Sequence, residues 1–265
     1  MKEADEVTQK AHIIGLDATI VDTPLPPIDT NVTEILPAVR SPWLPNSRSR
    51  SSSKRLESIA NVQIIQERCR QICLSSFFRR DTPIRSLGFT SAIAGEGKSF
   101  LTMVMANVLA NDSSEPVTLV ECNWDHPCFH EYFEIPPTPG LAEWLRGECD
   151  ETVVKHSFDN LTVIPAGNGR RDAVKLLRRL EQKGPLSALT PANGLLVIDL
   201  PPVIPTAYGA LAATLVESLI LVVRAGVTTD LMVTETCNQL KDMPVQGVIL
   251  NHMESRVPQW LRQLL

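Results

Sequence analysis

The sequence has few aromatic residues, no signal-like beginning and no long apolar run. Aromatic side chains make up 5% of the 265 residues, and the formal net charge is −5. Nucleic-acid-binding proteins are usually basic and often stack bases on aromatic rings, so both numbers argue against a nucleic-acid partner. The N-terminus is polar, and no stretch reaches the roughly 18 apolar residues that a membrane span needs. We therefore expect a cytoplasmic protein with no transmembrane segment of its own.

Cysteine pairs of the C-x-x-C type are also missing, although the chain has six cysteines. Their absence argues against an iron–sulfur carrier, and reduced thiols are the plain interpretation. One cluster has side chains that zinc uses, but zinc ligands usually come from two separated pairs rather than one tight run. We therefore do not favour a metal site in that cluster, which consists of Cys122, Asp125, His126, Cys128 and His130.

Residues 1–55 differ in composition from the rest of the chain. Prolines are dense there, and the segment ends in the Ser/Arg run SRSRSSSKR. Such a segment buries too little apolar surface to offset the entropy lost on ordering. The sequence therefore predicts a flexible N-terminal segment, 1–55, followed by one folded domain, 56–265, which opens with a helix over 56–76.

Short apolar runs alternate with helical stretches from Arg85 onward. Apolar strands separated by helices predict a mostly parallel sheet covered on both faces, a doubly wound α/β fold. Ligands of such sheets bind at the carboxyl ends of the strands. The expected strands are 87–89, 117–120, 161–164, 195–198, 219–223 and 248–250, and the expected helices are 99–110, 172–182, 207–216 and 229–241.

The segment LGFTSAIAGEGKSF joins a predicted strand to a predicted helix and reads as a Walker A loop, the P-loop of nucleotide-binding proteins. Gly95 and Gly97 let the backbone curl so that its N–H groups point at phosphate oxygens. Lys98 is expected to bridge the terminal phosphates, and the Ser99 hydroxyl to ligate Mg²⁺. Ala92 replaces the first glycine of the general motif. The sequence thus predicts an ATP or ADP site with contacts from Gly95, Glu96, Gly97, Lys98, Ser99 and Phe100.

A second apolar strand ends in a carboxylate, Asp199, and two prolines follow it. An aspartate at a strand tip beside a Walker A loop can hold Mg²⁺ through water, which is the Walker B role. A surface aspartate that opens a turn is the simpler alternative for this strand alone. The Walker A loop favours the magnesium role.

The order of the motifs resembles the bacterial tyrosine kinases of capsule and exopolysaccharide assembly, within the MinD/ParA-like group of P-loop proteins. The resemblance covers roughly residues 60–255 and rests on AGEGKS, TLVECNWDHP, GLAEWLRGE, DNLTVIPAGNG, LLVIDLPPVIP, LILVVRAGVTT and VQGVILNHM. It implies a protein that uses MgATP, that has a membrane-embedded polysaccharide co-polymerase or activator as its partner, and that reaches the inner face of the membrane through that partner. It also implies that Asn251 contacts adenine, although an asparagine that only caps a strand fits equally well. Arg224 either faces the nucleotide or is solvated.

Several positions depart from the pattern of that family. Glu121, Asn123 and Asp125 stand where its Walker A′ motif has Asp-x-Asp-x-Arg. The neutral Asn123 cannot act as a base, so Glu121 is the remaining candidate to orient or deprotonate an attacking hydroxyl or water, and to ligate Mg²⁺. Tyr208 stands where the family has a further acidic residue, in the helix after the Walker B strand. The tyrosine cluster of the family has no counterpart, because Tyr132 and Tyr208 are the two tyrosines of the sequence.

Three functions remain open at this point. The chain is an active autokinase or ATPase, a degenerate nucleotide-responsive regulator of a membrane co-polymerase, or a MinD/ParA-type positioning ATPase. MinD/ParA-type ATPases usually carry an extra lysine early in the P-loop. This chain has none there, since its early loop reads Ser91-Ala92-Ile93. Homo-oligomers are possible for the first two, although the Glu-x-x-Arg-x-x-Arg motif of the family keeps only Glu67 and Arg70.

Overall fold

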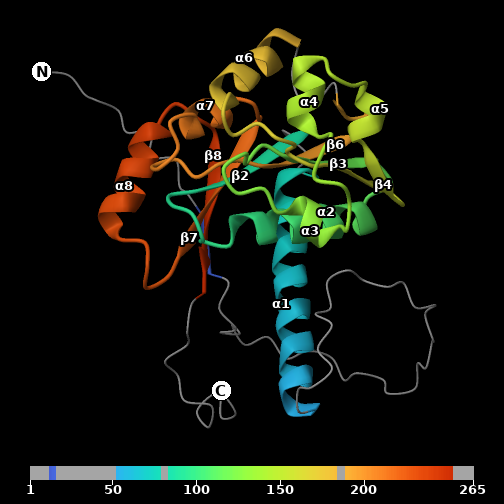
Figure 1. Cartoon of the computed structure of the whole chain (residues 1–265). Helices are drawn as coiled ribbons and strands as arrows, with labels where there is room; N and C mark the ends of the chain where they lie inside the picture. Colours follow the sequence, from blue (N-terminus) through green and yellow to red (C-terminus); the bar gives the residue numbers. More distant parts are fainter. Residues whose placement is uncertain (1–11, 16–51, 79–82, 184–188, 253–265) are drawn as a thin grey trace, which may run out of the picture.

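The computed structural model describes residues 12–15, 52–78, 83–183 and 189–252 (Figure 1). The strands are β1 (His12–Gly15), β2 (Ser86–Ser91), β3 (Val117–Glu121), β4 (His156–Phe158), β5 (Leu161–Ile164), β6 (Leu195–Asp199), β7 (Ser218–Arg224) and β8 (Val245–Asn251). The helices are α1 (Ser52–Ser76), α2 (Lys98–Asp112), α3 (Phe129–Tyr132), α4 (Leu141–Arg146), α5 (Glu151–Val154), α6 (Ala173–Lys183), α7 (Gly209–Ala213) and α8 (Asp230–Gln239).

The strands form one eight-stranded sheet in the order β1-β8-β7-β2-β6-β3-β5-β4. Neighbouring strands run parallel throughout, except that the edge strand β4 is antiparallel to β5. β2 lies between β6 and β7, so the three strands end side by side and bring their C-terminal loops together. The predicted doubly wound α/β fold is confirmed.

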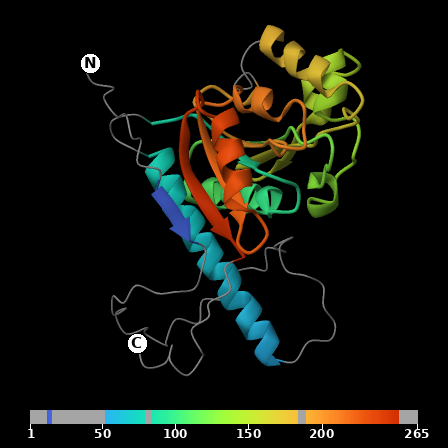
Figure 2. The ribbon, with the colours of Figure 1, turned by 90° about the vertical axis from the view of Figure 1, so that its left-hand side faces the viewer.

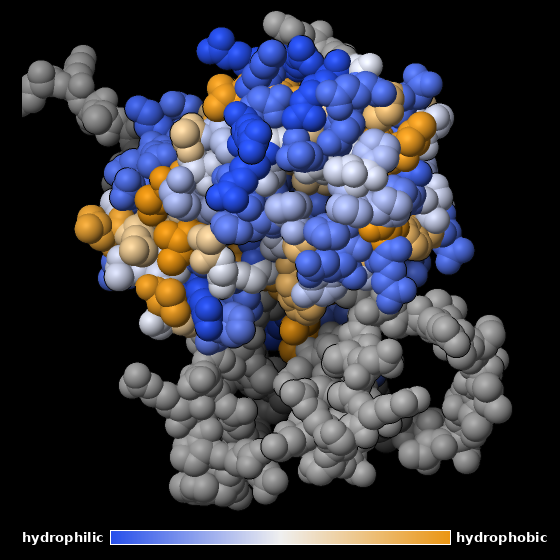
Figure 3. Space-filling model, in the orientation of Figure 1, coloured by the Kyte–Doolittle hydropathy of each residue, from blue (hydrophilic) through white to orange (hydrophobic). Residues whose placement is uncertain are grey.

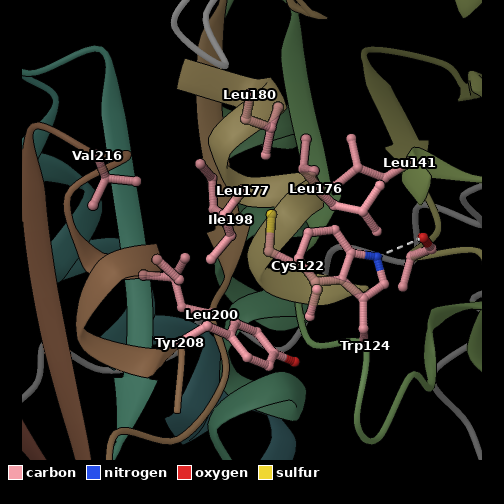
Figure 4. Packing of buried hydrophobic residues seen from close by; sticks show 14 of the residues in the cluster. Cys122, Trp124, Leu141, Leu176, Leu177, Leu180, Ile198, Leu200, Tyr208 and Val216 are labelled. Atoms are coloured by element: carbon pink, nitrogen blue, oxygen red, sulfur yellow. Dashed lines mark hydrogen bonds between the residues drawn. The ribbon is translucent and has the colours of Figure 1, made fainter. Parts of the chain in front are cut away.

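Helices cover both faces of the sheet, so the central strands are buried on both sides. Every residue of β2, β3 and β6 is buried. One face packs against α1 and α2 through side chains such as Phe89 and Leu101. The other face packs against α4, α6 and α7 and includes Trp124, Leu176 and Ile198 (Figure 4). A strand that is buried on both faces loses the period-two pattern of a half-exposed strand.

The C-terminal half of α1 packs along α2, while the helix extends well beyond the body of the domain (Figure 2). Cys69, Ile72 and Cys73 are buried in this contact. Burial raises the pKa of the Cys69 thiol to about 12, so the thiol stays protonated and acts as an apolar group. None of the helices in the described ranges combines the length and the apolar character that crossing a bilayer requires.

The six predicted strands and the five predicted helices are present, with shifted ends. The sequence did not predict β1, β4, α3, α4 or α5, which are short. β1 lies within the segment expected to be flexible and pairs with the edge of β8. α1 begins at Ser52, a few residues before the expected start of the domain. Residues 1–11 and 16–51 lie outside the described residues, so the flexible segment and its boundary stay predictions.

Candidate nucleotide-binding site

The predicted Walker A loop runs from the end of β2 to the start of α2, as its sequence requires. Gly95 and Gly97 both have positive φ angles, 83° and 87°, which side-chain-bearing residues avoid. A Cβ at Gly97 would also lie 2.2 Å from Asn251 Nδ2, whereas nothing lies within 4 Å of one at Gly95. Gly97 is therefore required for its dihedral angle and for space, and Gly95 for its dihedral angle alone.

Lys98, Ser99 and Asp199 meet where α2 begins and β6 ends. Lys98 Nζ donates to Asp199 Oδ1 at 2.9 Å, and Ser99 Oγ donates to Asp199 Oδ2 at 2.8 Å. The Asp199 side chain is fully buried and that of Lys98 is 6% exposed. The structure thus brings the three residues predicted for phosphate and Mg²⁺ into direct contact.

A hollow of about 300 Å³ opens over this triad. Asn123 lines it, and Asn123 Oδ1 is buried without a hydrogen-bond partner among the described residues, while its Nδ2 donates to His126 O at 3.3 Å. A buried oxygen without a donor calls for a ligand or water, and magnesium keeps several waters as it binds. The donor set of Ser99, Asp199 and Asn123 therefore fits a hydrated Mg²⁺ ion with a triphosphate. The hollow is lined by Ser91, Ala94, Gly95, Glu96, Gly97, Lys98, Ser99, Phe100, Asn123, His126 and Pro202.

Glu121, expected as a base or Mg²⁺ ligand, points into the protein. Its side chain accepts hydrogen bonds from the backbone N–H groups of Cys128 (2.5 Å), Phe129 (3.0 Å) and Ala166 (3.0 Å). Burial raises the pKa of Glu121 to about 7, although these hydrogen bonds oppose the shift. Both oxygens are thus engaged in holding two loops together. The role of Glu121 as a base or Mg²⁺ ligand stays a prediction, and this geometry does not favour it.

The carboxylate of Glu96, expected to contact phosphate, accepts hydrogen bonds from within the protein. One oxygen accepts from Ile93 N at 2.7 Å; the other accepts from Arg224 N at 3.1 Å and from the Thr228 hydroxyl. The side chain is 1% exposed. Glu96 therefore ties the P-loop to the turn after β7. Thr228 could not be singled out from the sequence, because its role appears only when the turn after β7 lies beside the P-loop.

Arg224 and Asn251 both lie against the P-loop, at the ends of β7 and β8. Arg224 Nη1 donates to Gly95 O at 3.4 Å, and Asn251 Nδ2 donates to Glu96 O at 2.9 Å. Asn251 Oδ1 accepts from the next backbone N–H, that of His252. Both residues support the loop in this structure, and their contacts with a nucleotide stay predictions.

The five residues considered above as zinc ligands, 122, 125, 126, 128 and 130, do not converge on one point. Cys122 is fully buried in the apolar core, whereas Asp125 accepts a hydrogen bond from the Tyr208 hydroxyl at 3.2 Å. In the described part of the chain, no group of three or more His, Cys, Asp or Glu side chains is placed to hold a metal ion.

The fold and the site allow comparison with known proteins. No protein-family model matches the sequence. The tyrosine-protein kinase ptk of Acinetobacter johnsonii is 28% identical over 162 residues, which are 60% of this chain and 22% of that kinase. The match therefore spans less than a quarter of that relative's own length.

Solved structures show the same fold. The kinase domain of the Escherichia coli tyrosine kinase ETK aligns with a TM-score of 0.65 at 23% identity, over 80% of this chain and 85% of that domain. A complex of Cyanothece McdA with ATP aligns with a TM-score of 0.52 at 18% identity, over 65% of this chain and 74% of that protein. In sequence, the chain is similar to the bacterial tyrosine kinases, and its fold is the P-loop fold of their kinase domains.

Proposed function

We propose that this protein binds MgATP and acts as a nucleotide-responsive regulator with little or no phosphoryl transfer. The single observation that carries the proposal is the contact of Lys98 and Ser99 with Asp199, beside a hollow lined by an Asn123 oxygen that has no hydrogen-bond partner within the described ranges. These groups suit phosphate and Mg²⁺, and the predicted base is committed elsewhere.

Each residue has a defined task when nucleotide binds. Lys98 would exchange part of its contact with Asp199 for the terminal phosphates, and the Ser99 hydroxyl would turn from Asp199 to the metal. Asp199 and Asn123 would help to hold the hydrated metal ion. Mg²⁺ supplies charge neutralisation on the phosphates. Asn123 cannot take a proton at neutral pH, and Glu121 offers no free oxygen, so binding is supported better than turnover.

The biological setting rests on the resemblance to the bacterial tyrosine kinases. We propose a cytoplasmic protein that docks on a membrane-embedded polysaccharide co-polymerase or activator and regulates exopolysaccharide or capsule assembly. A homo-oligomer has weaker support. Arg70, a residue of the oligomerisation motif, is engaged within the chain by Asp112 at 2.6 Å and by Glu67 at 2.6 Å.

An active autokinase is the second candidate, because Tyr132 is 42% exposed and therefore open to modification. Incubation of the purified protein with γ-labelled MgATP separates the two functions. The regulator predicts tight nucleotide binding without label on protein and without released phosphate. Label on Tyr132 or Tyr208, or steady phosphate release that disappears in Lys98→Ala, would establish an enzyme instead.

A further inference from the structure

A second hollow, distinct from the nucleotide site, lies at the start of α6. Its volume is about 540 Å³, and it shares no lining residue with the hollow over the P-loop. Pockets of several hundred cubic ångströms are of the size that small organic ligands occupy. Its lining consists of Arg170, Arg171, Asp172, Ala173, Val174, Lys175, Arg178 and Tyr208.

Four cationic side chains gather in this hollow, on a chain whose net charge is −5. Arg171, Lys175 and Arg178 are exposed, and none of them has an ion-pair partner among the side chains that the structure describes. The surface over α6 is strongly hydrophilic (Figure 3). A cluster of cations attracts a polyvalent anion.

Two carboxylates near the hollow, Asp172 and Asp125, have other partners among the described residues. The Asp172 carboxylate accepts two hydrogen bonds from the Arg146 guanidinium group, at 3.0 and 2.8 Å. Asp125 accepts from the Tyr208 hydroxyl and lies 3.7 Å from Arg170 Nε. Neither carboxylate forms an ion pair with Arg171, Lys175 or Arg178, although Asp172 attracts Lys175 at longer range. Among the described side chains, four cations therefore face two carboxylates at this hollow.

The periodicity of α6 explains this arrangement. Ala173, Leu176, Leu177 and Leu180 are buried against the sheet. Val174, Lys175 and Arg178 recur at helical spacing on the opposite face and turn outward. Since packing needs only the apolar face, the outward cations are not required by the fold.

We propose that this hollow binds an organic phosphate monoester. Arginine predominates among its cations, and the planar guanidinium group pairs with phosphate oxygens through two parallel hydrogen bonds. The volume exceeds that of a bare phosphate ion, and Tyr208, Ala173 and Val174 supply a partly apolar wall for the body of the ester. The shared chemistry is that of a free phosphate ester and of a phosphorylated tyrosine side chain.

The hollow also adjoins the nucleotide site through one loop. Asp125, which contacts Arg170 and Tyr208, stands between Asn123 and His126, and those two residues line the hollow over the P-loop. The two sites are therefore separate in their contacts but joined by a short stretch of backbone.

Calorimetric titration of the full-length protein with phenyl phosphate tests the proposal, with inorganic phosphate, phenol and a phosphotyrosyl peptide as further ligands. We expect phenyl phosphate to bind at least about fivefold more tightly than inorganic phosphate, and phenol not to bind. Tighter binding of the peptide than of phenyl phosphate would identify a protein as the source, and equal or weaker binding a free ester.

Two matched double variants locate the binding. Arg171→Gln with Arg178→Gln should weaken phenyl phosphate binding at least about tenfold, because two charge-assisted contacts are lost. Arg68→Gln with Lys241→Gln removes the same charge elsewhere on the surface and should leave binding unchanged.

Three outcomes would overturn the proposal: no binding of phenyl phosphate, equal loss in both double variants, or loss in Lys98→Met with retention in the Arg171/Arg178 variant. The last outcome would place the ligand in the P-loop. Since MgATP binding is measured separately on the unmodified protein, a failure here is distinguishable from a failure of the proposed nucleotide site.

Discussion

The ammonium group of Lys98 lies 2.9 Å from the carboxylate of Asp199, and both side chains are almost completely buried. This contact joins the Walker A loop to the tip of β6, and under the proposed function it is the charge pair that a nucleotide would meet. A buried ion pair costs desolvation energy when it forms, and removing one partner leaves an uncompensated charge.

Replacing Lys98 by methionine should therefore remove nucleotide binding and also destabilise the protein. We expect a loss of roughly 3–5 kcal/mol in the free energy of unfolding, because the buried Asp199 charge is left alone. The double variant Lys98→Met with Asp199→Asn should recover most of that stability but not the binding. Urea denaturation and calorimetry measure the two properties separately; an unstable double variant would contradict the assignment of the pair.

The two P-loop glycines offer a second, matched comparison. Gly95→Ala introduces only backbone strain, of about 1–2 kcal/mol at a positive φ. Gly97→Ala adds a collision with the Asn251 amide, so it should destabilise the protein more and weaken ATP binding more strongly. Combining Gly97→Ala with Asn251→Ala should recover part of the loss. Equal effects of the two single variants would show that Asn251 does not crowd the loop.

Glu121 should make stability depend on pH. Its pKa rises from 4.5 to about 7 on folding, so the folded state holds the proton more tightly than the unfolded state. The stability it contributes is complete below about pH 4.5 and is lost as the pH rises through 7. The loss is on the order of 3 kcal/mol.

Glu121→Gln tests this dependence. The variant sacrifices one backbone hydrogen bond, because its amide nitrogen faces a backbone N–H, but it cannot titrate. Urea denaturation at several pH values should show a falling stability for the unmodified protein relative to the variant between about pH 5 and pH 7. Parallel curves for the two proteins would mean that Glu121 stays ionised in the folded state.

Asn123→Asp restores a carboxylate to the hollow over the triad. If the missing charge limits turnover, phosphate release from MgATP should rise at least about tenfold, since a positioned general base contributes 10²–10⁴-fold. Asp125→Asn changes a neighbouring acid outside this hollow and should not raise the rate. An unchanged rate in Asn123→Asp would attribute the slow turnover to another feature.

The P-loop and the core strands could be predicted from the sequence because both follow from local patterns. AGEGKS lies between an apolar strand and a helix, and that context fixes where Lys98 and Ser99 sit. Asp199 was predictable for a related reason: in a parallel sheet, neighbouring strands end at the same edge, so a carboxylate at one strand tip reaches the loop after another.

The environment of each carboxylate could not be predicted in the same way. The sequence predicts that Glu121 and Glu96 face the nucleotide. Each carboxylate is instead buried and accepts hydrogen bonds from backbone N–H groups of other segments. Those donors come together only through tertiary packing. The hollow at α6 could not be predicted for a similar reason, because Tyr208 lies far along the chain from the cations that line the hollow with it.

Calorimetry can show whether the P-loop hollow binds nucleotide. Titration of the purified protein with MgATP and with MgADP should show saturable binding of one nucleotide per chain, and the signal should vanish in the stability-matched double variant Lys98→Met with Asp199→Asn. Absence of binding by the folded, unmodified protein, or equal binding by that double variant, would contradict the account.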